Sequence, residues 1–273
     1  MDLSTDDTAE SPSRQRRQAL RQRAITEAVM AEGSIRIEQL AERFDISVMT
    51  VHRDLDDLEG RGLLRKSRGM ATALSNALVE SSDVYRSGRE SLEKDAIAHA
   101  ALEFVEPGQA IFLDDSTTVM HLVPHLRTKR PLNVITNTLT IMDQLRVTNG
   151  ITLLALGGEY HNWCSAFMGH MTTTAVKALR ADLFIMSTAA ITDDVAFHQT
   201  LATVDVKRAM FESARTRILL ADHTKFEKRA LHALLPLTEF DAVIVDDGTD
   251  PAHVSRLRDK GVTVIVARRG ASR

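Results

Sequence analysis

Short runs of apolar residues recur from residue 110 onward, and stretches with helical spacing separate most of them. Because these runs are apolar throughout rather than alternating, they are typical of parallel strands covered on both faces. Strands that alternate with helices predict a mostly parallel α/β sheet. The predicted strands are AIFLD (110–114), LNVIT (132–136), ITLLALG (151–157), LFIMSTA (183–189), RILLAD (217–222), DAVIVDD (241–247) and VTVIVA (262–267). The predicted helices between them include TVMHLVPHL, TTTAVKALR, VDVKRAMFESA and PAHVSRLRDK.

Three helix-spaced stretches precede these runs, at about residues 16–32, 38–44 and 47–59. Gly33 ends the first of them. The third has apolar residues at i, i+4 and i+7, a spacing that lets one helix face pack on its neighbours. The side chains expected to face inward are Leu40, Ala41 and Phe44 in the second helix and Val51, Leu55 and Leu58 in the third.

Between these two patterns lies a stretch rich in small polar residues, as is typical of a linker. A helix predicted at about residues 89–105 follows and stops at Pro107-Gly108. The acidic, polar start of the chain has the composition of a disordered tail and not of a signal peptide. The expected segments are a tail at 1–13, a helical domain at 14–71, a linker at 72–88 and an α/β domain at 89–273.

Composition narrows the class of protein. With 44% hydrophobic residues, the chain of 273 residues can fill the cores of two domains. The net charge of -3 gives no basic field over the whole protein, so any contact with nucleic acid must be local. The single cysteine, Cys164, excludes an internal disulfide framework, and no apolar run reaches the length of a membrane span. We therefore expect a cytoplasmic protein that does not bind membranes.

The stretch SVMTVHRDLDDLEGRGLLRKSRG (47–69) carries the chemistry of the first domain. A capped helix that follows a tight turn and begins with polar residues has the geometry that enters the major groove of DNA. The following GLLRKSRG predicts a hairpin wing whose basic side chains suit the phosphate backbone. A small bundle with a solvated charged face is the alternative. The residues expected to contact DNA are Ser47, Met49, Thr50, His52, Arg53, Arg65, Lys66 and Arg68.

Loops after the predicted strands carry the candidate ligand site of the second domain. The strand AIFLD runs into DSTT and then a helix, an arrangement that can bind an anion, although a hydroxyl there can also simply cap the helix. Two adjacent glycines allow close approach of backbone to a ligand, and lysines with aspartates offer a polar lining for a phosphorylated sugar. Each charge taken alone is more often a surface residue. The candidate ligand-binding residues are Asp114, Ser116, Thr117, Thr118, Asn137, Thr138, Gly157, Gly158, Lys207, Asp222 and Lys225.

Two further kinds of chemistry are considered. His121 and His125 stand four residues apart, a spacing that can bind metal, but no carboxylate or cysteine completes the set nearby in sequence. No GxGxxG, Walker A, GxSxG or HExxH motif occurs, so we expect neither a cofactor nor a metal. Acid/base catalysis by the aspartates and lysines would instead make the protein a sugar-phosphate isomerase or transferase with an added helical domain, which is the alternative function.

Residues 33–71, GSIRIEQLAERFDISVMTVHRDLDDLEGRGLLRKSRGMA, resemble the winged helix-turn-helix of the DeoR family of bacterial transcription regulators. Residues 89–247 resemble the effector domain of that family, which is similar in fold to ribose-5-phosphate isomerase and CoA transferases. The matching segments are DDSTT (114–118), VITNTL (134–139), LGGEY (156–160), VKRAM (206–210) and LLADHTKF (219–226). The resemblance implies a repressor of a carbohydrate operon that binds a DNA operator, responds to a phosphorylated sugar or related metabolite, and forms a dimer or tetramer.

Several positions depart from the family pattern. His52 stands where the family usually has Arg, and the wing has Arg68-Gly69-Met70-Ala71 instead of His-Gly-Gly-Ala. In the second domain, Ser116 and Ala190 replace glycines and Thr203 replaces a glutamate. The first group of departures bears on which operator is recognised. The second group predicts either an unusual ligand or a lost response to ligand.

Overall fold

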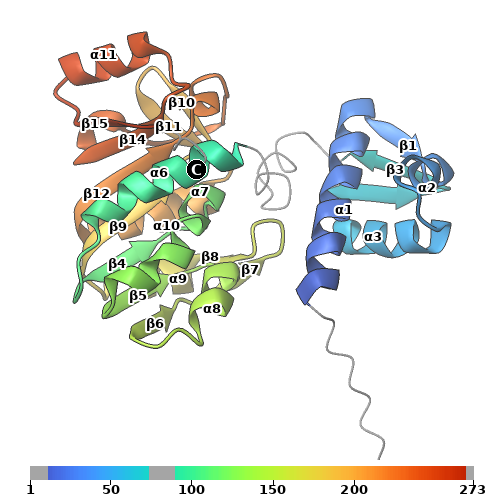
Figure 1. Ribbon diagram of the computed structural model, residues 1–273, viewed down its shortest axis with the longest axis horizontal. Coiled ribbons are helices and arrows are strands. Elements are labelled where there is room, and N and C mark those ends of the chain that lie inside the picture. Colours follow the sequence, from blue (N-terminus) through green and yellow to red (C-terminus); the bar gives the residue numbers. More distant parts are fainter. Residues whose placement is uncertain (1–11, 74–89, 269–273) are drawn as a thin grey trace, which may run out of the picture. The chain divides into compact units, whose positions relative to one another are not determined.

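The structure is a computed structural model that describes residues 12–73 and 90–268, and these fall into two compact units. In the first unit, helices pack against a small antiparallel sheet (Figure 1). The strand order of this sheet is β1-β3-β2. Its elements are α1 (Pro12–Glu32), β1 (Ser34–Arg36), α2 (Ile37–Phe44), α3 (Val48–Gly60), β2 (Leu64–Ser67) and β3 (Met70–Ala73).

Local backbone geometry sets the ends of these elements. Gly33 has a φ of +72°, a left-handed conformation that glycine adopts easily and that ends α1. Asp45 has a φ of 50° and ends α2, where its backbone N–H donates to the carbonyls of the last turn. The hydroxyl of Ser47 accepts a hydrogen bond from the backbone N–H of Thr50 at 3.1 Å, so Ser47 caps α3 as predicted.

The predicted helices of this unit are present, and the predicted wing is the hairpin of β2 and β3. Two details of the prediction were wrong. Helix α1 begins at Pro12 instead of about residue 16. Phe44 is only half-buried, because it lies in the last turn of α2, where the guanidinium of Arg43 is 5.9 Å from its ring.

One parallel sheet forms the middle of the second unit. All the predicted strands are present and pair in the order β15-β14-β12-β9-β4-β5-β6, and every pair is parallel. The prediction of a parallel α/β sheet is therefore confirmed. The strands are β4 (Ala110–Leu113), β5 (Leu132–Thr136), β6 (Ile151–Ala155), β9 (Ala181–Ser187), β12 (Ala214–Ala221), β14 (Ala242–Asp246) and β15 (Val264–Ala267).

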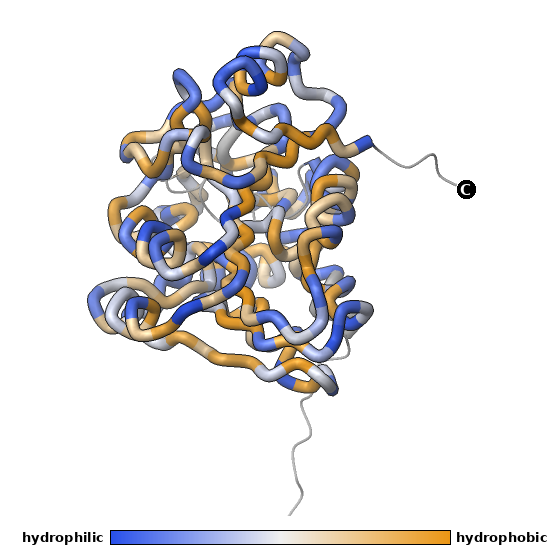
Figure 2. Tube along the Cα trace, turned by 90° about the vertical axis from the view of Figure 1, so that its left-hand side faces the viewer, coloured by the Kyte–Doolittle hydropathy of each residue, from blue (hydrophilic) through white to orange (hydrophobic). Residues whose placement is uncertain are grey.

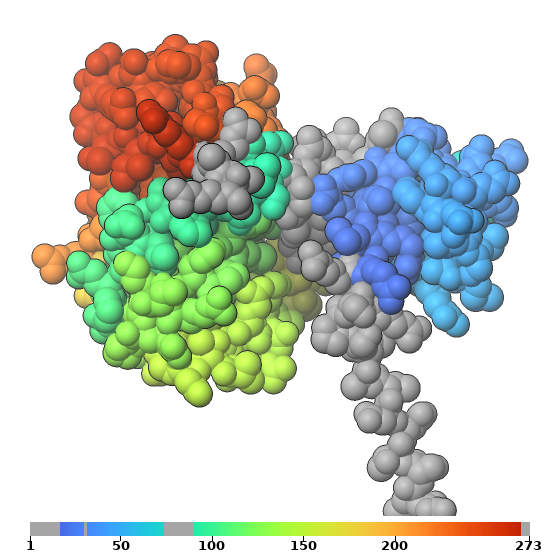
Figure 3. Space-filling model, viewed as in Figure 1, coloured from blue at the N-terminus to red at the C-terminus, as the bar shows by residue number. Residues whose placement is uncertain are grey.

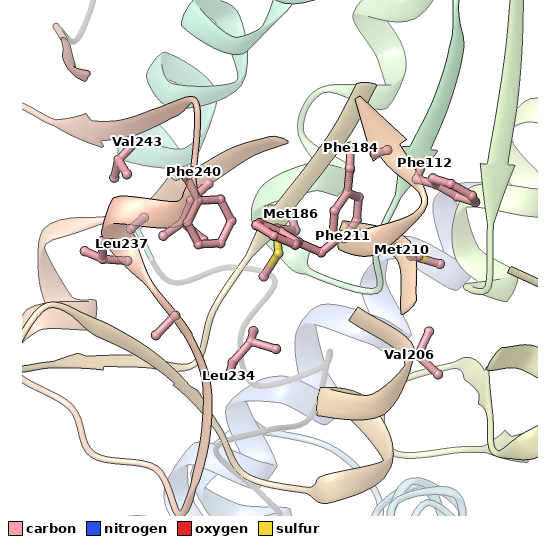
Figure 4. Close-up of a cluster of buried hydrophobic side chains, with 14 of the residues drawn as sticks. Phe112, Phe184, Met186, Val206, Met210, Phe211, Leu234, Leu237, Phe240 and Val243 are labelled. Carbon is pink, nitrogen blue, oxygen red and sulfur yellow. The ribbon is translucent and has the colours of Figure 1, made fainter. Parts of the chain in front are cut away.

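Successive residues of the central strands point to opposite faces of this sheet and join two separate hydrophobic cores. In β4, Ile111 and Leu113 belong to one core and Phe112 to the other. The tube in Figure 2 is hydrophobic along the strands in the middle of this unit, and Figure 4 shows side chains of the core that contains Phe112. This burial on both faces explains why the strands are continuously apolar.

Helices cover both faces (Figure 1). The core that contains Ile111 includes side chains of α6 (Ser91–Ala101), α7 (Thr117–Met120), α8 (Leu139–Leu145) and the 3-10 helix η2 (Val123–Lys129). The core that contains Phe112 includes side chains of α9 (His170–Lys177), α10 (Leu201–Glu212) and α11 (Pro251–Asp259). Residues 240–268, which include α11, form one end of the surface of this unit in Figure 3. Three further 3-10 helices in the described part are η1 (Leu102–Phe104), η3 (His223–Phe226) and η4 (Leu237–Glu239).

Two small antiparallel sheets escaped prediction because their strands are only three to five residues long, too short for an alternating pattern to stand out. A predicted helix over 118–126 is in fact α7 followed by η2, because Pro124 lacks the N–H that a continuing α-helix needs. The additional strands are β7 (Glu159–His161) and β8 (Ala166–Met168) in one sheet, and β10 (Ala190–Thr192), β11 (Val195–His198) and β13 (His232–Pro236) in the other.

Most of the predicted tail and linker lies outside the described residues. Of these two segments the structure describes Pro12 and Ser13, which belong to α1, and residues 72–73, which belong to β3. Among the helices of residues 12–73 and 90–268, none combines the length and hydropathy needed to cross a membrane.

Candidate DNA interface and effector site

Helices α2 and α3 form a helix-turn-helix whose second helix has one buried and one open face. Val51, Leu55 and Leu58 are fully buried, as predicted, and fix α3 against the rest of the unit. On the remaining surface, Met49 is 63% exposed and Arg53 is exposed. The predicted contacts Ser47 (exposed) and Thr50 and His52 (both half-buried) lie in the same first turns of α3.

The start of α3 is held in shape by its own polar groups. The hydroxyls of Ser47 and Thr50 lie 2.8 Å apart in addition to the capping bond. The backbone N–H groups and side chains of this turn therefore form a preorganised polar surface. Such a surface can donate to phosphate oxygens or to base edges, which are the contacts that position and specify a recognition helix.

Helix α1 braces α3 through a buried carboxylate that sequence reasoning missed. Asp54 is 1% exposed and accepts hydrogen bonds from Arg21 Nε at 2.5 Å, from Arg21 Nη2 at 3.1 Å and from Gln22 Nε2 at 3.2 Å. The hydrogen bond from Arg21 raises the pKa of that guanidinium above its ordinary value. Because the partners are more than thirty residues apart in the sequence, no local motif could have shown this contact.

The basic side chains of the wing differ in their exposure and in their ion pairs. Arg65 and Arg68 are exposed, and Arg68 and Gly69 form the tip of the hairpin with φ values of 50° and 75°. The tip is fixed to α2, because the carbonyl of Gly69 accepts a hydrogen bond from the N–H of Ile37 at 2.9 Å. In contrast, the ammonium of Lys66 forms an ion pair with Asp56 of α3. Lys66 is therefore a predicted DNA contact whose positive charge is already compensated by a carboxylate of the same unit.

A buried cluster of charges lies at the carboxyl ends of β4 and β9 in the second unit. The ammonium of Lys207, on α10, forms ion pairs with Asp114 and, at 3.1 Å, with Asp115 Oδ1, and it donates to the carbonyl of Ser187 at 3.2 Å. Burial alone would lower the pKa of Lys207, but the two carboxylates raise it above its ordinary value. Sequence reasoning selected Asp114 and Lys207 but missed Asp115 and Ser187, although Asp115 stands in the same DDSTT segment.

A second cluster lies at the carboxyl end of β12. Asp222 is fully buried, caps η3 by accepting from the N–H of Thr224 at 3.1 Å, and lies 3.5 Å from the ammonium of Lys225. Burial would raise the pKa of Asp222, but the charges of Lys225, Lys94 and Lys228 and the hydrogen bond from Thr224 hold it below its ordinary value. Lys94, on α6, is 2% exposed and was also missed, because a single lysine on a helix is ordinarily a surface residue.

The loop after β4 is buried and well ordered by its own hydrogen bonds. Asp114 accepts from the N–H of Ser116 at 2.9 Å, and the hydroxyl of Ser116 caps α7 by accepting from the N–H of Val119 at 3.2 Å. Ser116 therefore caps α7, and the anion-binding role expected of it stays a prediction. Thr117 and Thr118 are buried beside it in the first turn of α7.

The predicted residues at the ends of β5 and β6 serve the packing of the hairpin β7–β8 and of α9. Asn137 Nδ2 donates to the carbonyl of Phe167 at 2.9 Å, and Thr138 Oγ1 donates to the carbonyl of Ser165 at 3.2 Å. Within the described residues, Asn137 Oδ1 is buried without a hydrogen-bond partner.

Of the two glycines after β6, Gly158 faces protein, whereas Gly157 is exposed and a Cβ on it would meet nothing within 4 Å. A Cβ on Gly158 would come within 2.1 Å of Thr172 Oγ1. Thr172 also donates to the carbonyl of Gly157 at 2.9 Å. The close packing of α9 therefore requires glycine at position 158, whereas the space beside Gly157 is open.

The three positions of the second domain that depart from the family pattern, Ser116, Ala190 and Thr203, are all buried. Ala190 is fully buried in β10, and Thr203 is 1% exposed in the first turn of α10. Thr200 caps α10, because its hydroxyl accepts a hydrogen bond from the backbone N–H of Thr203 at 3.3 Å. In residues 12–73 and 90–268 no three His, Cys, Asp or Glu side chains are grouped to hold a metal ion, and His121 instead lies 2.5 Å from Asp95.

Comparison with known proteins assigns both units. Residues 21–77 match the family model described as the DeoR-like helix-turn-helix domain, and residues 89–247 match the DeoR C terminal sensor domain. The chain belongs to the DeoR family. It is therefore a DNA-binding transcriptional regulator and not an enzyme, as the family members similar to it are also regulators.

Two relatives and one solved structure illustrate these similarities. The transcriptional repressor AccR of Agrobacterium fabrum is 31% identical, over 84% of this chain and 90% of its own. The lactose phosphotransferase system repressor of Lactococcus lactis subsp. lactis is 32% identical, over 84% of this chain and 91% of its own. Among solved structures, ribose 5-phosphate isomerase from Plasmodium falciparum matches 50% of this chain and 53% of its own at 18% identity, with a TM-score of 0.37.

Proposed function

We propose that this DeoR-family regulator represses a carbohydrate-metabolism operon and leaves its operator when a phosphorylated sugar binds at the strand ends of the second unit. The observation that carries the DNA half of the proposal is the open face of α3, with Met49 and Arg53 exposed beside a capped first turn. Family membership, and the names of relatives such as the lactose phosphotransferase system repressor, support the carbohydrate half.

On DNA, α3 would lie in the major groove and the wing would lie on the backbone. Arg53 can reach the acceptors of a guanine, and Thr50 and His52 can contact bases or phosphates near it. Arg65 and Arg68 would bind phosphates, which carry affinity without sequence information. Lys66 would contribute less, because its ammonium already pairs with Asp56. Two copies of the chain would present two such helices, and we expect their half-sites about one helical turn, roughly 34–36 Å, or a multiple of it, apart.

The distribution of buried charge supports a ligand with one anionic end and several hydroxyls. One cluster has a single positive charge, Lys207, against two carboxylates, Asp114 and Asp115. Hydroxyl groups suit it, because a carboxylate accepts their hydrogen bonds. The other cluster has one carboxylate, Asp222, against the positive charges of three lysines that act on it, Lys94, Lys225 and Lys228.

A phosphate would go to the cluster with excess positive charge, at the end of β12. The strands β4 and β12 are separated only by β9, so the two clusters stand about 10 Å apart across the sheet, which is on the scale of a sugar phosphate. Asn137 and Thr138 follow β5, which is the neighbour of β4 in the sheet. They would therefore contact the sugar at the end that lies near Asp114 and Asp115. Asn137 Oδ1, buried without a partner within the described residues, is an acceptor that a ligand hydroxyl would satisfy.

Ligand control follows if the ligand binds more tightly to a conformation that binds the operator poorly. The factor by which ligand then weakens DNA binding equals the factor by which DNA weakens ligand binding. The test is to measure DNA affinity with and without ligand, and ligand affinity with and without DNA. Equal factors would show that one equilibrium connects the two units. Unequal factors would show that a separate process, such as a change in oligomer size, intervenes.

The deciding experiment is binding of the full chain to the DNA upstream of its own gene at fixed salt, with and without ribose 5-phosphate, glycerol 3-phosphate and fructose 6-phosphate. Arg53→Ala is expected to weaken specific binding by about 1–3 kcal/mol if Arg53 contacts a base edge. Its effect on random DNA should be smaller. Equal losses on both DNAs would limit Arg53 to phosphate contacts, and the absence of any specific binding by the wild-type chain would overturn the proposal.

A further inference from the structure

The sheet edges of the second unit differ in how well they are protected. An edge strand turns backbone N–H and C=O groups outward, where another chain can pair with them. In the described part of this unit, the edge strands of four or more residues are β6, β13 and β15. On β13, the guanidinium of Arg208 donates to the carbonyls of Ala233 and Leu234 at 2.9–3.0 Å. On β15, the guanidinium of Arg258 donates to the carbonyl of Val264 at 2.9 Å. Side chains of the same unit thus occupy these two edges.

Strand β6, which lies at one end of the sheet (Figure 1), has no such protection. Its sequence, ITLLA, contains neither a charged residue nor a proline, and its register with β5 is continuous, without a bulge. These are the devices that ordinarily keep an edge strand from pairing with another chain. Their absence from β6, beside two blocked edges in the same unit, indicates that this edge is kept open for a partner.

The open edge of β6 consists of the outward backbone groups of residues 151, 153 and 155. The N–H of Leu132 in β5 donates to the carbonyl of Gly150 at 3.1 Å, so residues 152 and 154 continue the ladder with β5 and the residues between them face outward. Within residues 12–73 and 90–268, the N–H groups of Leu153 and Ala155 donate to no acceptor. Ala155 is also exposed, so this part of the edge is accessible.

Antiparallel pairing with the β6 strand of a second copy would satisfy these groups. A two-fold axis at Leu153 places that residue opposite its own counterpart and places Ile151 opposite Ala155. Residues opposite each other in this register exchange N–H and C=O, so both free N–H groups of each copy find an acceptor. The side chains match as well, because the large Ile151 lies beside the small Ala155. Ile151 and Leu153 already pack against the core that contains Ile111, and the partner strand would extend that apolar surface.

The charges at the two ends of β6 favour the same orientation. Before the strand, Arg146 is exposed, and Arg130 is exposed and donates to the carbonyl of Asn149 at 2.8 Å. After the strand, Glu159 begins β7 with its side chain 76% exposed. Antiparallel pairing brings the beginning of one strand beside the end of the other, so the arginines of one copy would approach the partner's Glu159. The edge is therefore complementary to itself in charge.

We propose that the open edge of β6 is the docking site for a second copy of this chain, and that the two copies join their sheets across a two-fold axis. A second copy is the occupant that the edge fits, because the strand complements itself in hydrogen bonds, side-chain size and charge. This inference goes beyond the proposed function, which uses two copies of the chain but assigns no surface to them. It also stands apart from that function, because two chains can pair in this way whether or not they bind an operator.

The test measures the dimer dissociation constant of the full chain by sedimentation velocity over a dilution series without DNA. Ala155→Pro removes an outward donor without touching the ladder with β5, and Ala155→Lys adds a positive charge near the partner's Arg146. Val266→Pro and Val266→Lys are the matched controls, because Val266 is exposed and has the same outward position on β15. We expect both Ala155 variants to weaken dimerisation about 10-fold or more, as the loss of one hydrogen bond from each copy would. The controls should stay within about twofold.

Hydrogen exchange gives a direct readout of the strand pairing. The amide of Leu153 should exchange more slowly in wild type than in Ala155→Lys, and the amide of Ile265 in β15 should exchange equally in both. A wild-type chain that stays monomeric throughout, or a dimer unchanged in both Ala155 variants, would overturn the proposal. Equal weakening by the Val266 variants would overturn it too, because the effect would then not belong to β6. If Ala155→Pro melts well below wild type, Ala155→Lys and hydrogen exchange decide the outcome. Pairing through β6 in a chain that binds no upstream DNA would refute the proposed function alone.

Discussion

The DNA-binding unit exposes the side chains with which it is expected to act, whereas the sensor unit buries them. Met49 and Arg53 stand open on α3. By contrast, Asp114, Lys207 and Asp222 are each 1% exposed or less and are paired with one another or with neighbouring charges. An exposed recognition surface needs only a rigid support, because DNA supplies the partners. Buried charges must already have partners, so a ligand can enter only by exchanging them, and such exchanges suit a switch.

The largest effect should come from breaking a buried pair in the sensor unit. Lys207→Met would leave Asp114 and Asp115 buried without their ammonium, and we expect the unfolding free energy of that unit to fall by about 3–5 kcal/mol. Chemical denaturation followed by circular dichroism measures it. Lys177→Met, an exposed lysine on α9, should change the same quantity by no more than about 0.5 kcal/mol. Similar losses in both variants would mean that the buried cluster is not specially stabilising.

In residues 12–73 of the DNA-binding unit one charged side chain, Asp54, is buried, and it supports the proposed recognition helix α3 from inside the unit. Asp54→Ala would remove the acceptor of Arg21 and Gln22, and we expect a loss of about 1.5–3 kcal/mol, the range for hydrogen bonds to charged groups. Arg21 is partly exposed, so the loss should be smaller than for Lys207. Denaturation of the full chain should show an earlier transition of this unit with the sensor transition unchanged. A coincident shift of both transitions would show that the two units unfold together.

On the exposed side, the comparison between Arg65 and Lys66 asks whether pairing inside the protein reduces a DNA contact. Arg65→Ala should lower the slope of log affinity against log salt by about one unit, as expected for one lost phosphate contact. Lys66→Ala should lower it by less, because Asp56 already compensates that ammonium. Asp56→Asn should in turn increase affinity for any DNA. Equal slopes for the two alanine variants would show that DNA displaces Asp56 at no cost.

The difference between local patterns and contacts that are distant in the sequence explains which features could be predicted from the sequence. Runs such as AIFLD predicted the parallel strands correctly, because residues buried on both faces must all be apolar. The cap at Ser47 was predictable because it is a local contact over three residues. Asp54 and Lys94 were missed, because a charge on a helix carries no local sign of burial, and the partners of Asp54 are also distant in the sequence.

The glycine pair after β6 shows a different limit of prediction from sequence, because one local pattern fits two structural explanations. Gly157-Gly158 has the composition of a ligand loop, but a glycine is also required where the backbone packs closely against a helix, as it does at Gly158. Only the structure shows that Thr172 occupies the space where a side chain on Gly158 would go. The roles proposed for the residues at the strand ends and on α3 stay predictions, because they concern partners that lie outside the chain.

The smallest expected effects concern two histidines of the sensor unit whose pKa values move in opposite directions. Burial would lower the pKa of His223, but the hydrogen bond to Asp246 and nearby carboxylates raise it above its ordinary value. Burial and the neighbouring His99 lower the pKa of His125. His223 thus binds its proton more tightly in the folded state, so its contribution is complete below about pH 6.5 and is lost as the pH rises through its folded pKa. His125 binds its proton less tightly in the folded state, so stability falls as the pH drops below about 6.5.

Each histidine should therefore shape one side of the stability profile of this unit. His223→Gln should flatten the decline above about pH 6.5 and leave the acid side unchanged, while His125→Gln should do the reverse. Unfolding free energies measured from about pH 5.5 to 8 would separate these slopes from any constant offset that the substitutions introduce. If His223→Gln changes only the offset, the pairing with Asp246 does not persist in solution.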